Sequence, residues 1–101
     1  MGRQRAGSIG GVTILIDEAI WPAHDTLWAH LVSDESYAEL HAFAAAQGLP
    51  ARGFDHDHYD VPEARLAELV AAGAQPVTGL ELARRLERSG LRVSQRTKRG
   101  L

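Results

Sequence analysis

The sequence predicts a small α/β domain with a sheet of three or four strands and three helices. Three observations support this prediction. A β-branched, apolar run at residues 12–16 is typical of a buried strand. Boxes of the type Ser/Thr/Asp-x-x-Glu begin at Ser36, Asp60 and Thr78 and are typical helix starts. A chain of 101 residues suffices for one hydrophobic core, so we expect a single domain over residues 12–91.

The composition is that of an ordinary globular protein, with 45% hydrophobic and 24% charged residues. No apolar run approaches the roughly 20 residues that span a bilayer, so we expect no membrane contact. The chain has no cysteine, which excludes disulfides and thiolate metal sites. Any metal site needs His, Asp and Glu, and we expect the reducing cytoplasm as the location.

The net charge of −2 hides a strong asymmetry along the chain. Residues 1–11 carry +2, residues 12–83 carry −10, and residues 84–101 carry +6. We expect residues 1–11, which are rich in Gly and Arg, to be a disordered extension, and residues 92–101 to be a solvated basic tail. An acidic body repels a polyanion, so we expect at most weak, salt-sensitive binding to nucleic acid.

The first strand is expected to be central in the sheet, because residues 12–16 are apolar on both faces. Asp17 follows it directly. An acid just past a buried strand suits the crevice in which open α/β sheets bind ligands, and it equally suits a turn cap. The sequence leaves these two interpretations open.

A surface loop at residues 19–26, carrying Trp21 and His24, is expected before a second strand at residues 27–33. Alternation places His30 on the same face as Trp28. A histidine in that setting is more often a packed, hydrogen-bonded core residue than a ligand.

The first helix should begin at the Ser36 box and end at Gly48. Two polar residues beside it suit a site. Asp34 lies in the turn that leads from the strand into the helix, and His41 lies at the edge of the apolar stripe. His41 either lines a site or borders the core.

The stretch from Phe54 to Asp60 is chemically the densest in the chain. If it is extended, His56, His58 and Asp60 point to one side, because side chains alternate with a period of two. Such an array suits zinc, manganese, nickel or iron. The alternative is a solvated loop in which Asp60 caps a helix through a box with Glu63.

The remaining chain predicts two helices separated by a short strand. The helix at residues 61–72 should end at Gly73, and the strand should cover residues 74–77. The last helix should run from Thr78 to Gly90. Its Arg84, Arg85 and Arg88 are expected to face water.

The combined order of these motifs resembles an uncharacterised bacterial family, the domain of unknown function DUF4031. The resemblance covers residues 12 to about 82, and residues 1–11 would extend beyond it. The residues that carry it are Asp17, His30-Leu31, Glu39-Leu40-His41-Ala42-Phe43-Ala44, His58-Tyr59-Asp60, Arg65 and Gly73-Ala74. The resemblance implies no activity.

Two classes of function fit these residues. The first is a small ligand-binding or interaction module, whose polar His/Asp cluster is a structural hydrogen-bond network. The second is a metal-dependent hydrolase, with a phosphoester as substrate. Its divalent metal would be held by Asp17, Asp34, His58 and Asp60, with His30 or His41 as acid/base.

The sequence favours the binding module, because it contains neither a His-Glu-x-x-His motif nor a Gly-rich phosphate loop. Small-molecule binding fits both classes. We also expect a homodimer, because a second copy would bury apolar residues such as Trp21 or Trp28.

Overall fold

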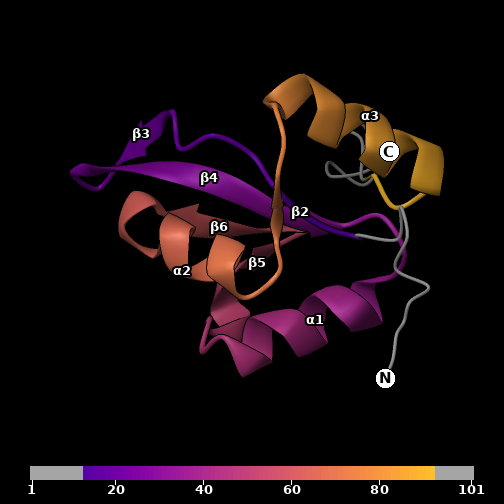
Figure 1. The fold of residues 1–101 in the computed structure, drawn as a ribbon, viewed down its shortest axis with the longest axis horizontal. Coiled ribbons are helices and arrows are strands. Elements are labelled where there is room, and N and C mark those ends of the chain that lie inside the picture. The colour runs from indigo at the N-terminus through magenta and orange to yellow at the C-terminus, as the bar shows by residue number, and fades with distance from the viewer. Residues whose placement is uncertain (1–12, 93–101) are drawn as a thin grey trace.

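A computed structural model describes residues 13–92 of the chain (Figure 1). The predicted extension at residues 1–11 lies outside these residues, and so does the basic tail beyond Arg92. The elements, in order, are β2 (Ile14–Ile16), β3 (Trp21–Ala23), β4 (Thr26–Ser33), α1 (Tyr37–Ala46), the 3-10 turn η2 (Ala51–Gly53), β5 (Phe54–Asp55), β6 (His58–Pro62), the 3-10 turn η3 (Glu63–Arg65), α2 (Leu66–Ala71), β7 (Gln75–Pro76) and α3 (Gly79–Ser89).

The fold is α/β, and the described part of the chain has three helices around one mixed sheet. The strand order is β5-β6-β4-β2-β7, and β3 pairs with the first part of β4. The pairing is antiparallel except between β2 and β7, which are parallel. Within the described residues the sheet has six strands, so the predicted number of three or four was too low.

Helices cover both faces of the sheet (Figure 1). On one face, α1 and α2 pack Leu40 and Leu69 against Ile16 and Leu31 of the strands. On the other face, α3 packs its buried leucines against Leu15 and Val32 in a smaller cluster. The predicted central strand is confirmed, because β2 is buried along its whole length and lies between β4 and β7.

The helix starts predicted at Ser36 and Thr78 are confirmed through the N-cap half of each box. Ser36 accepts a hydrogen bond from the amide of Glu39, and Thr78 accepts one from the amide of Glu81. The predicted stop at Gly90 is also confirmed, because this residue ends α3 in the left-handed conformation that only glycine adopts without strain.

The second capping box is wrong. Asp60 lies inside β6, where the Cα register pairs it with His30 of β4. The segment that was predicted as one helix at residues 61–72 therefore begins as strand, passes through η3 and becomes helical only at Leu66. Pairing with β4 prevails over the local helix signal.

Two hairpins account for the unpredicted strands. β3 and β4 are joined by His24 and Asp25, which have φ of 51° and 65°. Two positive φ angles match the right-handed twist of a tight hairpin, although Asn-Gly is the usual sequence for it. In the second hairpin, His56 turns the chain between β5 and β6 with φ of 62°.

Among the described residues, no helix is long and apolar enough to cross a membrane.

Candidate functional site

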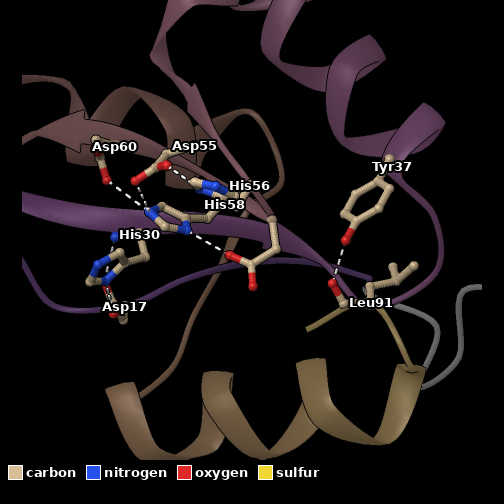
Figure 2. A network of polar contacts seen from close by, with 9 residues as sticks. Asp17, His30, Tyr37, Asp55, His56, His58, Asp60 and Leu91 are labelled. Atoms are coloured by element: carbon tan, nitrogen blue, oxygen red, sulfur yellow. Dashed lines mark hydrogen bonds and ion pairs between the residues drawn. The ribbon is translucent and has the colours of Figure 1, made fainter. Parts of the chain in front are cut away.

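The site is built on two neighbouring strands, β4 and β6. His30 and Asp60 are directly opposite in the antiparallel register, so their side chains share one face of the sheet. His58 lies two residues before Asp60 on β6 and points to the same side. This is the face that α3 partly covers, and Figure 2 shows the three side chains converging there.

The three side chains form the one cluster of metal-ligating type found among residues 13–92. One ligand atom from each of His30, His58 and Asp60 lies within 4.8 Å of the other two. Nε2 of His58 is 3.1 Å from Oδ1 of Asp60. The two imidazoles meet edge to face, with ring centroids 4.9 Å apart.

Each imidazole contacts a buried carboxylate through its Nδ1. Nδ1 of His30 is 2.8 Å from Oδ2 of Asp17, whose Oδ1 also accepts the amide of His30 at 2.6 Å. Nδ1 of His58 is 2.7 Å from Oδ1 of Asp57. A carboxylate at Nδ1 keeps the proton on that nitrogen and leaves Nε2 as the free ligand atom.

The carboxylates also alter the protonation of His30. The hydrogen bond to Asp17 raises the pKa of this imidazole above its ordinary 6.5. Desolvation acts in the opposite direction, and the negative charges of Asp17, Asp60 and Asp57 support the rise.

Oδ1 of Asp60 is a buried atom with no hydrogen bond from the described residues, despite its short distance from His58. With the proton of neutral His58 on Nδ1, Nε2 presents a lone pair to this oxygen. Two acceptors 3.1 Å apart require either a cation between them or a second proton on the imidazole.

A cavity of about 610 Å³ opens beside the cluster, between the sheet and α3. Its polar part is formed by His30, His58, Asp17, Glu18, Asp57 and Arg92. Its volume suits a small molecule.

Two predicted site residues lie elsewhere. Oδ2 of Asp34 is 2.9 Å from both Nε and Nη2 of Arg85, so this acid ties the end of β4 to α3. Arg85 was expected to face water, and that expectation is wrong. Nδ1 of His41 is 2.7 Å from the hydroxyl of Tyr59, whose ring belongs to the core on the opposite face of the sheet.

The expected His-x-His-x-Asp row holds only for His58 and Asp60. His56 lies in the hairpin turn, is exposed, and has its Nδ1 2.6 Å from Oδ1 of Asp55. The same turn brings Asp57 back to His58, although strict alternation placed these two side chains on opposite faces. The sequence does not indicate this turn, because neither of its two residues, His56 and Asp57, is a glycine or an asparagine.

A family model described as "Protein of unknown function (DUF4031)" matches residues 14–89 of the chain. No curated protein and no solved structure matches the chain.

Proposed function

Because the chain belongs to the DUF4031 family, whose function is unknown, we propose a function from the geometry of the site. The domain binds a divalent transition metal through His30, His58 and Asp60, and the bound metal supports hydrolysis of a small molecule. One observation carries the proposal: three ligand atoms lie within 4.8 Å of one another, and both imidazoles are held at Nδ1 by carboxylates.

The donor set determines the kind of metal. Two imidazoles and one carboxylate suit zinc, manganese and iron(II), and they suit calcium or magnesium poorly. Three protein ligands leave at least one coordination position open, as in catalytic rather than structural zinc sites. The cavity beside His30 and His58 gives a substrate access to that position.

A metal held by His30, His58 and Asp60 would act as a Lewis acid and would make a water molecule acidic enough to serve as the nucleophile near neutral pH. Hydrolysis would join the oxygen of water to the acyl carbon or phosphorus, break the bond to the leaving alcohol, and give a proton of that water to the alcohol. Asp17 and Asp57 orient the imidazoles throughout.

The competing function is a binding module without metal. In it, the polar cluster is a structural network in which His58 contacts Asp60 directly, with Nε2 of His58 3.1 Å from Oδ1 of Asp60.

Calorimetry distinguishes the two functions. Zinc, manganese and iron(II) are titrated at pH 7.5 into chelator-stripped protein, and at least one should bind with a Kd below about 10 µM. His58→Ala should weaken binding at least about 100-fold, because it removes a ligand atom. His56→Ala is the matched control, since this exposed histidine lies two residues away and outside the cluster.

Metal binding weaker than about 0.1 mM would contradict the proposal, and so would an equal effect of the two alanine variants. Hydrolysis is then measured on p-nitrophenyl acetate. The rate should depend on the metal and disappear in His58→Ala but not in His56→Ala.

A further inference from the structure

The cavity beside the proposed metal centre has mostly apolar walls. Trp21 and Trp28 come from the β3–β4 hairpin, and Val32 lies further along β4. Leu82 and Leu86 come from α3 on the opposite side. A cavity of about 610 Å³ is far larger than one water, so a metal-bound water alone leaves these walls uncovered.

The aromatic part of the wall is held in place by contacts within the protein. Trp21 and Trp28 are directly opposite in the hairpin register. Nε1 of Trp28 donates to the carbonyl of Ala23 at 2.8 Å, and the ring of Trp21 stacks on His30 with centroids 5.9 Å apart. A surface that is already ordered adds affinity for an apolar group, because little conformational entropy is lost on binding.

The charge around the site selects against phosphates. Asp17, Glu18 and Asp57 line the cavity, Asp60 lies in the cluster, and Arg92 is the one arginine in the described lining. A divalent ion and Arg92 together offset three of these four negative charges. The site therefore stays negative even with metal bound, and a dianionic phosphoester is repelled.

We infer that the cavity is a binding site for a small molecule with an aromatic or branched aliphatic body and a metal-coordinating head that is neutral or singly charged. The inference rests on the proposed metal centre. The body lies between the two tryptophans and the leucines of α3, and the head reaches the open position beside His30 and His58.

Three simple probes test the ligand class by calorimetry on the zinc-loaded full chain. Benzohydroxamate and acetohydroxamate share a metal-binding head and differ in the body, whereas phenylphosphonate keeps the ring and carries more charge. After correction for their affinities for free zinc, benzohydroxamate should bind at least about tenfold more tightly than acetohydroxamate. It should also bind more tightly than phenylphosphonate.

A variant with a larger side chain in the cavity tests whether the probe binds there. Ala83 lines the cavity from α3, so Ala83→Leu should weaken benzohydroxamate at least about tenfold and leave zinc and acetohydroxamate within about twofold. Ala67→Leu, on the exposed side of α2, is the matched control and should change none of the three affinities. Should Ala83→Leu fail to fold by circular dichroism, the comparison of the probes on the unaltered protein decides alone.

The outcomes separate this inference from the metal proposal. Zinc binding with equal corrected affinities for the two hydroxamates overturns the ligand class only. Tighter binding of phenylphosphonate also overturns it and favours a phosphoester. Failure to bind zinc, manganese and iron(II) overturns the metal centre first, and the inference falls with it.

Discussion

The pair between His30 and Asp17 should make the stability of the metal-free domain depend on pH. The pKa of His30 is raised in the folded state, mainly by its hydrogen bond to Asp17. The stabilisation is therefore complete below pH 6.5 and is lost as the pH rises through the raised value. Asp17→Asn keeps an acceptor for the amide of His30 and removes the charge.

We expect Asp17→Asn to destabilise the domain by about 0.5–1 kcal/mol more at pH 6 than at pH 9, a modest difference because the His30 side chain is 37% exposed and solvent screens its charge. Urea unfolding at both pH values measures it. Asp25→Asn is the control, because this acid lies in the exposed β3–β4 turn. Its loss of stability should be the same at pH 6 and pH 9. A cost of Asp17→Asn that does not change with pH would show that His30 stays neutral.

Asp57 should act on the metal through His58. Its carboxylate holds Nδ1 at 2.7 Å, so Asp57→Asn leaves all three ligands present and misorients one of them. We expect zinc affinity to fall about 10–100-fold. Calorimetry measures the fall, with Asp25→Asn again as control. An unchanged affinity would remove Asp57 from the site.

For the site residues, the sequence predicts the direction of the side chains correctly only where the strand is regular. His58 and Asp60 share a face as predicted, because β6 keeps its period of two. Asp17 was foreseen at the strand end, but its contact with His30 depends on register between strands that no local pattern encodes. Asp57 was misplaced because a positive φ at His56 reverses the chain.

At the scale of elements, Glu39 connects α1 to the sheet. Its carboxylate accepts hydrogen bonds from Thr13 and Ser33, both at 2.6 Å. The sequence identified Glu39 as part of a capping box with Ser36, and the cap itself is present. The contacts to the strands could not be inferred, because they join residues brought together by the β2–β4 pairing.

We expect Glu39→Ala to destabilise the domain by about 2 kcal/mol, because two hydroxyls lose a charged acceptor in a partly buried site. Glu35→Ala, at an exposed acid just before α1, should change stability by less than about 0.5 kcal/mol. Urea unfolding compares the two variants. Equal effects would mean that water replaces the carboxylate.

Helix starts were easier to predict than strands, because a helix start depends on local residues and a strand depends on its pairing partner. The boxes at Ser36 and Thr78 were sufficient because a helix start is a local structure. The box at Asp60 did not start a helix, because the same residues pair with β4 as the strand β6. The short strands β3 and β5 escaped prediction because pairing across two tight turns, rather than composition, makes them strands.

At the scale of the whole molecule, three large apolar side chains within residues 13–92 are exposed: Ile20 at 73%, Trp21 at 46% and Leu80 at 62%. Ile20 and Trp21 line the cavity, and Leu80 follows Gly79, which also lines it. Such side chains on one region of a small domain favour association, and we propose that two copies pair through this region. Trp28 is half-buried and its Nε1 donates to the carbonyl of Ala23, so it would contribute less to such an interface than Trp21.

Light scattering after size exclusion tests the homodimer. The chain should give about 22 kDa, twice its mass of 11.0 kDa, and the value should fall on dilution. Leu80→Glu should give a monomer, because a charge cannot be buried unpaired in an apolar interface. Ala67→Glu, which adds the same charge to the exposed side of α2, should leave the mass unchanged. A mass of 11.0 kDa for the unaltered chain at every concentration would exclude the dimer, and the exposed apolar side chains would then serve the cavity alone.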